Sequence, residues 1–380
     1  MANPNPKRAK SGADGKIRYA VIGLGYISQV ALLPAFAHAK KNSELVALVS
    51  GDPEKLKQLS RQYGVQRTYS YEQYEDCLNG GEVDAVYIGL PNHMHRDYTV
   101  RAARAGVHIL CEKPMAVTEQ DCEVMIAEAR EKEVKLMIAY RLHFEEANLK
   151  AIELVQSGKL GEVRLFNSTF TQQVQEGNIR VRRETGGGTL YDIGIYCINA
   201  ARYLFRAEPS EVFAVTANNG EERFREIEEM ASAVLRFPGD RLAAFTCSFS
   251  TAPVSTYRIV GSKGDLRLDP AYDFVGDLKH YLTIEGKTKE TKFSSRDQFA
   301  PQLLYFSDCV LNDKEPEPSG EEGLADVRII RALYRSAQSG QPVRLEPFER
   351  QHWPTPDQEI EQPPVKKPKL VNASSPSGKQ

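Results

Sequence analysis

Two short segments carry side chains that could hold a hydroxyl group and move its proton. In Cys111–Pro114 the proline fixes the local backbone, so that Lys113 presents its ammonium in one direction. In Gly186–Tyr196 three glycines allow a tight turn before a helix, on which Asp192 and Tyr196 share one face. The ammonium can stabilise a developing alkoxide and favours a nearby phenolate, so Tyr196 is a candidate acid/base and Asp192 a candidate substrate ligand. The alternative interpretation is structural: an aspartate that complements the helix dipole and a tyrosine that packs.

A glycine-containing turn follows the first apolar run of the chain. The run Ile17–Ile22 leads into Gly-Leu-Gly-Tyr-Ile-Ser at positions 23–28. Gly23 permits a tight turn, and Gly25 lets the backbone approach a pyrophosphate at the N-terminus of the next helix. Ser28 takes the third small position, where Gly or Ala is usual, and is compact enough for close packing. This order of strand, turn and helix predicts a dinucleotide-binding site.

The end of the next strand bears on which nucleotide binds. An NAD site usually carries an acidic residue there, bonded to the ribose 2′-hydroxyl, but this position is Ser50. A hydroxyl can accommodate a 2′-phosphate, which Lys55 could approach from the following helix. The sequence therefore favours NADP. In the alternative, Asp52 bonds the ribose of NAD and Lys55 is an ordinary exposed residue.

The elements that must position these groups fall into two patterns. Residues 17–143 alternate strands and helices, which predicts a doubly wound parallel sheet, a Rossmann domain. Residues 144–346 read as an α+β domain with a largely antiparallel open sheet flanked by helices. A helix at 145–156 leads into the predicted strands, which are Val163–Phe170, Val212–Ala217, Ala231–Phe237, Arg241–Ser250 and Thr256–Val260. Helices at 189–204, 299–312 and 321–339 are expected to pack on the sheet.

The two ends of the chain are polar. Residues 1–16 predict a flexible arm without the apolar stretch of a secretory signal. Residues 347–380, rich in Pro, Gln, Lys and Ser, predict a tail that is flexible or lies along a surface. Its Lys-Lys-Pro-Lys run is interpreted as solvated, rather than as a nuclear address or a phosphate contact.

Composition excludes several classes of function. The net charge of −2 gives no field for capturing nucleic acid, and no run of about 20 apolar residues predicts a membrane span. The six cysteines form no C-x-x-C pair and no cluster with zinc spacing, so we expect no metal and reduced, mostly buried thiols. A cytoplasmic location is the default expectation.

Taken together, the motifs AVIGLGYIS, the Pro91–His95 segment, CEKP and GGGTLYDIGIY resemble those of the Gfo/Idh/MocA oxidoreductase family, and within it the glucose–fructose oxidoreductase branch. The resemblance covers residues 17–345. It implies catalytic roles for Lys113, Asp192 and Tyr196, the last standing where many members have His. It implies a cofactor site formed by Gly23, Gly25, Tyr26, Ile27, Ser50, Lys55, Pro91, Asn92, His95, Glu112 and Lys113. It also implies a substrate cleft bordered by Tyr140, Arg141, His143, Asp192, Tyr196 and Arg183, although Arg183 fits a solvent-exposed arginine equally well.

The implied reaction is hydride transfer between a sugar carbon, C1 of an aldose, and NADP. Tyr196 would take the hydroxyl proton while Lys113 positions the hydroxyl, and a second sugar would reoxidise nucleotide that stays bound. One alternative is a dehydrogenase that releases NADP each cycle and acts on a pentose, a pyranoside or an inositol. Another is a nucleotide-sensing regulator without catalysis, against which the joint presence of the three catalytic candidates argues. Relatives pair through the C-terminal sheet, which implies a homodimer or homotetramer.

Overall fold

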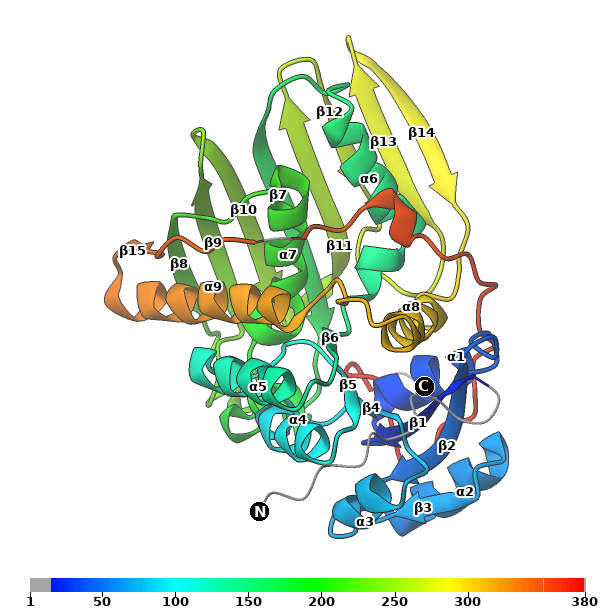
Figure 1. Cartoon of the computed structure of the whole chain (residues 1–380). Coiled ribbons are helices and arrows are strands. Elements are labelled where there is room, and N and C mark those ends of the chain that lie inside the picture. Colours follow the sequence, from blue (N-terminus) through cyan, green and yellow to red (C-terminus); the bar gives the residue numbers. More distant parts are fainter. Residues whose placement is uncertain (1–14, 351, 379–380) are drawn as a thin grey trace.

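Six parallel strands form the first sheet, in the order β3-β2-β1-β4-β5-β6 (Figure 1). The computed structural model describes residues 15–350 and 352–378, so the predicted N-terminal arm lies almost wholly outside the described residues. The strands are β1 (Ile17–Ile22), β2 (Ser43–Val49), β3 (Arg67–Tyr69), β4 (Ala85–Ile88), β5 (His108–Cys111) and β6 (Leu136–Ile138). This strand order confirms the predicted Rossmann fold.

Helices cover both faces of this sheet. They are the π-helical turn η1 (Ser28–Leu32), α1 (Leu33–Ala35), α2 (Pro53–Tyr63), α3 (Tyr74–Asn79), α4 (His95–Arg104) and α5 (Glu119–Glu131). One further helix, α8 (Ala300–Leu311), comes from the far end of the sequence and packs against β1 and β2. Tyr19 of β1 forms a 2.8 Å hydrogen bond with Ser307 of α8. The prediction that residues 299–312 pack on the second sheet was therefore wrong, because this helix completes the core of the first.

Nine strands form the second sheet, in the order β14-β13-β12-β11-β7-β10-β9-β8-β15. All neighbouring pairs are antiparallel except β7 and β10, so the sheet is mixed but largely antiparallel, as predicted. The strands are β7 (Val163–Gln173), β8 (Glu211–Ala217), β9 (Met230–Phe237), β10 (Arg241–Ser248), β11 (Ser250–Gly261), β12 (Gly264–Leu268), β13 (Leu278–Ile284), β14 (Lys287–Phe293) and β15 (Val343–Arg344).

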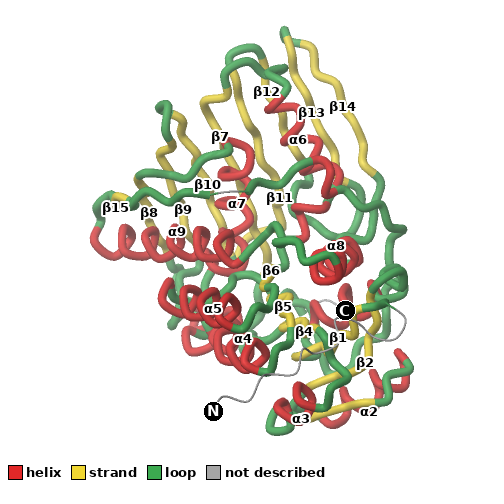
Figure 2. The backbone as a smooth tube through the Cα atoms, viewed as in Figure 1, coloured by secondary structure: helices red, strands yellow, loops and turns green. Residues whose placement is uncertain are grey.

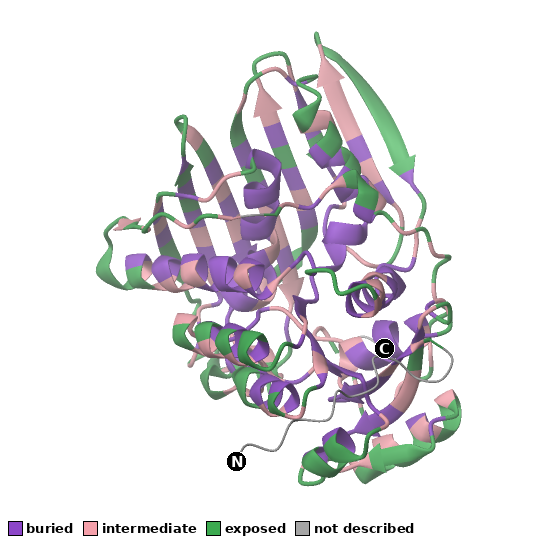
Figure 3. Cartoon of the chain, viewed as in Figure 1, coloured by how far each residue is buried: buried purple, intermediate pink, exposed green. Residues whose placement is uncertain are grey.

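Helices cover only one face of the second sheet. Figure 2 shows α6 (Glu146–Gln156), α7 (Ile195–Phe205) and α9 (Gly320–Ser339) on that side. Along the central strands, buried residues alternate with exposed or half-buried ones (Figure 3). The period of two places one row of side chains under the helices and the other on an open face.

A buried ionic cluster joins α7 to α9. The fully buried guanidinium of Arg202 donates to Glu322 and Asp326 of α9 and to Glu208 beyond α7. The Glu322 carboxylate also contacts Arg350 at 2.7 Å. Despite burial, which would raise it, the positive charges of Arg202 and Arg350 hold the pKa of Glu322 below its ordinary value. These pairs keep the helix that carries Tyr196 in register with α9.

The C-terminal segment returns from the second domain to the first, as the red ribbon in Figure 1 shows. The buried side-chain amide of Gln358 donates to the Glu317 carbonyl at 2.9 Å, and Val371 is buried against the first domain. The sequence predicted a tail from residue 347 that is flexible or lies along a surface, and residues 352–378 lie along a surface. Isolated apolar side chains and backbone hydrogen bonds anchor this segment, and neither is visible in its polar composition.

Three general features concern the described residues alone. All six cysteines are buried free thiols. No helix in this part of the chain is long and apolar enough to cross a membrane. Within residues 15–350 and 352–378, no three His, Cys, Asp or Glu side chains gather as a metal site would require.

Candidate active site

A cavity of about 800 Å³ lies between the carboxyl ends of the first sheet and the second domain. This is the edge of a doubly wound sheet at which ligands bind. Its walls include the glycine turn at residues 23–27, the ends of β2, β4 and β5, strand β7, the turn before α7 and the C-terminal segment. The volume is in the usual range for a small-molecule or cofactor site.

The glycine turn forms one end of the cavity. Gly23 has φ of 89°, and a Cβ there would lie 2.6 Å from the Gly89 carbonyl oxygen, so no larger residue fits. At Gly25, by contrast, a Cβ would meet nothing within 4 Å, so the backbone faces open space. Ser28 is buried, and its hydroxyl donates to the Gly23 carbonyl at 2.7 Å. The serine thus packs closely and stabilises the turn.

Ser50 and Lys55 line the same end of the cavity, whereas Asp52 does not. The Asp52 carboxylate caps α2, accepting hydrogen bonds from the backbone N–H groups of Glu54 and Lys55. Its second oxygen accepts from the Asn372 side chain at 2.9 Å, and these bonds lower the pKa of Asp52. Burial lowers the pKa of Lys55, although the nearby Asp52 charge opposes the shift. The Asp52 carboxylate is thus already engaged, which disfavours its alternative role as a ribose ligand.

Lys113 and Asp192 meet at the other end of the cavity. The Lys113 ammonium donates to the backbone carbonyl of Asp192 at 2.7 Å and lies 3.8 Å from its carboxylate. Asp192 lies in η6 (Leu190–Gly194), a π-helical turn, and such turns are frequent at functional sites. Its carboxylate also accepts from Arg180 at 2.8 Å and Gln172 at 2.9 Å. Burial alone would raise the pKa of Asp192, but Arg180 and Lys113 outweigh it and leave the pKa lowered.

The ring of Tyr196, one turn beyond Asp192, lies against the cationic side chains of Lys113 and Arg141. The Lys113 nitrogen lies 4.5 Å from the ring centroid, and the Arg141 guanidinium carbon lies 5.1 Å away. Phe170 and Tyr272 pack on the ring with centroids 5.5 and 5.8 Å distant. Aromatic and cationic contacts therefore fix the orientation of the Tyr196 ring, and Tyr196 lines the cavity.

Two polar residues, Arg141 buried and Glu112 half-buried, support this end of the site. Arg141 lines the cavity and donates to the Tyr272 carbonyl and the Gln298 side chain. Glu112 also lines it and accepts a 2.5 Å hydrogen bond from the Tyr87 hydroxyl. Burial raises the pKa of Glu112, and the Tyr87 bond partly opposes this rise.

Four residues proposed for the site do not line this cavity. His95 is fully buried behind it, with its ring nitrogens 2.9 Å from the Leu90 and Pro114 carbonyl oxygens. Tyr140 and His143 stack on one another behind Tyr196, where His143 contacts Asn199 and Glu317. Arg183 is exposed and donates to Glu226. The expectation that these four residues contact the cofactor or the substrate directly is therefore corrected. His95 joins two loops of the cavity wall, Tyr140 and His143 pack behind it, and Arg183 faces solvent. The remaining candidates, Pro91 and Asn92 among them, line the cavity.

Arg180 is a member of the cluster that sequence reasoning missed. The glycine turn before η6 holds it in place: a Cβ at Gly187 would lie 2.3 Å from the Arg180 carbonyl oxygen, and Gly188 N–H donates to that oxygen. The three arginines at 180, 182 and 183 look alike in the sequence, and no pattern shows which of them turns inward. Gln172, Gln175, Phe274 and Ser375–Ser377 were missed too, because they reach the cavity from strands and loops distant in the chain.

Comparisons with known proteins agree with this geometry. One family model, an oxidoreductase family with an NAD-binding Rossmann fold, matches residues 17–140, and a GFO/IDH/MocA C-terminal domain matches residues 148–267. D-xylose 1-dehydrogenase (NADP(+)) of Haloarcula marismortui is 34% identical over 344 residues, covering 89% of this chain and 95% of the relative.

Two solved structures are similar over most of the chain. Aldose-aldose oxidoreductase from Caulobacter crescentus, complexed with glycerol, has a TM-score of 0.83 at 41% identity, covering 87% of this chain and all of that one. A 3-ketoreductase from Actinomadura kijaniata in complex with NADP and TDP-benzene has a TM-score of 0.78 at 28% identity, covering 84% and 98%. Both halves of the fold and the motifs at the cavity thus lead to one assignment: the chain belongs to the Gfo/Idh/MocA family of oxidoreductases.

Proposed function

We propose that this protein is an NADP-dependent sugar oxidoreductase that oxidises an aldose at C1. The observation that carries the proposal is the cluster of Lys113, Asp192 and Tyr196 in a cavity whose other end is a dinucleotide-binding turn. The relatives named above support the sugar class, since they act on D-xylose and on aldoses.

Each member of the cluster has a distinct task. Tyr196 accepts the proton of the C1 hydroxyl, for which Lys113 supplies the neighbouring positive charge. Asp192 stays ionised beside Arg180 and accepts hydrogen bonds from sugar hydroxyl groups. The C1–H bond breaks as hydride and the O–H bond as a proton, so a pyranose becomes its lactone.

The end of the cavity that the glycine turn forms fits NADP. The open backbone at Gly25 suits a pyrophosphate, and Ser50 with Lys55 suits a 2′-phosphate, while Asp52 is occupied as a helix cap. NADP, when bound, supplies the hydride acceptor. In the finer form of the proposal, a second sugar takes the hydride back before the nucleotide leaves.

The test uses the protein as purified, at high concentration and without added nucleotide. Single aldoses are mixed with it while the near-ultraviolet absorbance of reduced nicotinamide is followed. A rise of one turnover, reversed by a second sugar, is the expected result. Turnover only after free NADP is added would support the alternative dehydrogenase that releases its cofactor. Absence of reduced nucleotide with every aldose would refute the proposal.

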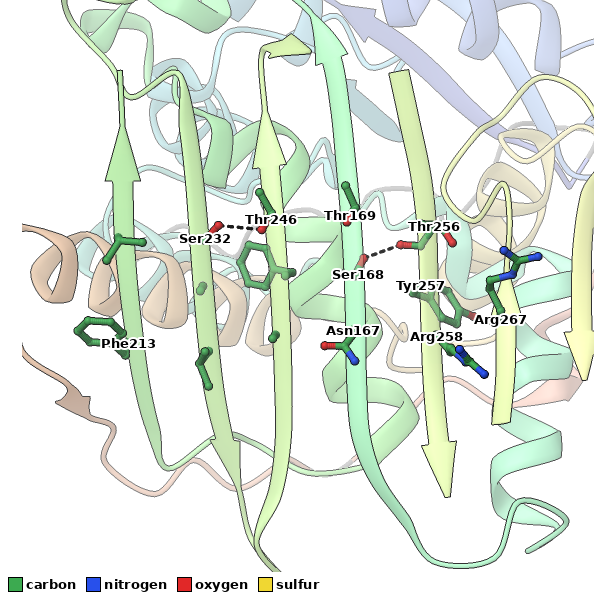
Figure 4. A pocket seen from close by; sticks show the side chains of 15 residues that line it. Asn167, Ser168, Thr169, Phe213, Ser232, Thr246, Thr256, Tyr257, Arg258 and Arg267 are labelled. Atoms are coloured by element: carbon green, nitrogen blue, oxygen red, sulfur yellow. Dashed lines mark hydrogen bonds between the residues drawn. The ribbon is translucent and has the colours of Figure 1, made fainter. Parts of the chain in front are cut away.

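We also propose that two chains pair through the open face of the second sheet, as a homodimer or as half of a homotetramer. A shallow hollow of about 510 Å³ lies there, lined by Ser, Thr and apolar side chains of β7–β12 together with Asn167, Arg258 and Arg267 (Figure 4). Five large apolar residues are exposed on these strands: Leu165, Val215, Val234, Leu242 and Val254. Such a patch is typical of an association surface. Sedimentation should give a dimer or tetramer for the natural protein and a monomer for Val234→Glu; monomers in both would contradict the pairing.

A further inference from the structure

Residues 371 and 372, near the end of the described chain, are tied to the nucleotide-binding turn of the first domain. Val371 exchanges two backbone hydrogen bonds with the Gln29 side chain: its N–H donates at 2.8 Å and its carbonyl accepts at 2.9 Å. The same Gln29 amide donates to the Leu24 carbonyl of the glycine turn at 2.9 Å. One residue later, Asn372 donates to Asp52, the cap of the helix that carries Lys55.

The segment then crosses to the second domain. Gln175, in the loop after β7, donates its backbone N–H to the Pro376 carbonyl at 2.9 Å and its side-chain amide to the Ser377 carbonyl at 3.0 Å. At this second anchor, Ser375, Pro376 and Ser377 line the cavity. They share it with Gly25, Ser50 and Lys55, the residues proposed to hold the nucleotide phosphates.

We propose that residues 370–378 form a strap that is part of the nucleotide-binding site and slows the release of NADP. The inference rests on the proposed function, because it takes the cavity to be the NADP site. The strap spans both domains across the phosphate end of the cavity. A bound dinucleotide therefore leaves only after the strap detaches from Gln29, Asp52 or Gln175.

The anchors are strong enough to make detachment slow. Val371 is buried, and Gln29 is 1% exposed, so separating them uncovers an apolar side chain and leaves buried amide groups without partners. Because Gln29 also holds the glycine turn, the strap position and the shape of the phosphate site are coupled. Retention of nucleotide between turnovers is what a sugar-to-sugar hydride exchange requires.

The experiment measures how fast nucleotide leaves the full-length protein. NADPH is bound to each variant and chased with excess NADP while nucleotide fluorescence is followed. Val371→Asp places a charge at the buried anchor, and Lys367→Ala is the matched control, an exposed residue of the same tail that does not line the cavity. We expect Val371→Asp to release NADPH at least about tenfold faster, since one buried apolar side chain is equivalent to roughly that factor. Lys367→Ala should match the natural protein.

A milder pair of variants guards against a folding defect. If Val371→Asp melts at a lower temperature than the natural protein, the test is made with Val371→Ala and Asn372→Ala instead. Each of these should still release NADPH faster than the natural protein. Equal release rates in all folded variants would overturn the strap while leaving the proposed function intact. Failure of the natural protein to bind NADPH would overturn both.

Discussion

Replacing Tyr196 with Phe separates the chemical role of its hydroxyl from the packing of its ring. The ring contacts Phe170, Tyr272, Lys113 and Arg141 through its faces and edges, and phenylalanine keeps all of these contacts. Within the described part of the chain, no hydrogen bond holds the hydroxyl. The variant should therefore fold with nearly the natural stability and bind NADPH with unchanged affinity.

Turnover, in contrast, should fall steeply. A positioned acid/base contributes about 10²–10⁴ in rate. At about 1.36 kcal/mol for each factor of ten, its loss raises the barrier by roughly 3–5 kcal/mol. The ammonium of Lys113, 4.5 Å from the ring centroid, cannot replace it, because a protonated lysine has no lone pair to accept the hydroxyl proton.

The assay compares single-turnover rates of nucleotide reduction by an aldose in Tyr196→Phe and in a matched control, Tyr191→Phe. Tyr191 lies on the adjoining π-helical turn, and its hydroxyl donates to the Val117 carbonyl at 2.6 Å. The control should lose about 1 kcal/mol of stability and keep its reduction rate. A Tyr196→Phe rate within tenfold of the natural one would refute the assignment of the proton to this residue.

Three further predictions concern the cofactor and the scaffold. Lys55→Ala should weaken NADPH binding by roughly 10- to 100-fold, the value of a charge-assisted contact, with NADH affinity nearly unchanged in fluorescence titrations; equal losses for both nucleotides would contradict the 2′-phosphate role. Burial lowers the pKa of His280 to about 4, below its ordinary value near 6.5, so the unfolded state binds more protons between these values. Stability should therefore fall as pH drops through this window, and melting curves of His280→Gln should show a weaker fall; an unchanged pH dependence would contradict it. Arg202→Met leaves Asp326 buried without its guanidinium partner and Glu322 with Arg350 alone, and should cost about 3–5 kcal/mol in urea unfolding, against less than about 1 kcal/mol if water can reach the carboxylates.

Local order in the sequence made much of the site predictable. The strand, the glycine turn and the following helix are contiguous, so residues 17–28 contain the whole geometry of the dinucleotide turn. Asp192 and Tyr196 are one turn apart, and Lys113 follows directly from β5. The sequence did not predict that η6 is π-helical, which turns the Asp192 carbonyl toward Lys113.

Contacts between distant segments were not predictable in the same way. Helix α8 has apolar residues suited to any sheet, and nothing local shows that its partner is β1, almost 300 residues earlier. Strands β12, β13 and β14 lack a strong alternation of apolar residues and were missed. The anchor of Val371 on Gln29 depends on two residues more than 300 positions apart, each unremarkable by itself.

The return of α8 to the first sheet has a consequence for how the protein is made. The face of β1 and β2 with Tyr19 and Val21 on it packs against η1 and α1, including Phe36, but the part that α8 covers stays open until residue 311 has been synthesised. At about 5–20 residues per second, roughly 10–35 s pass between translation of β6 and translation of the end of α8. During that interval the nascent first domain leaves part of an apolar surface uncovered beside the ribosome, so chaperone capture should be concentrated on this face. A gene fragment that stops at the domain boundary should yield aggregated protein for the same reason.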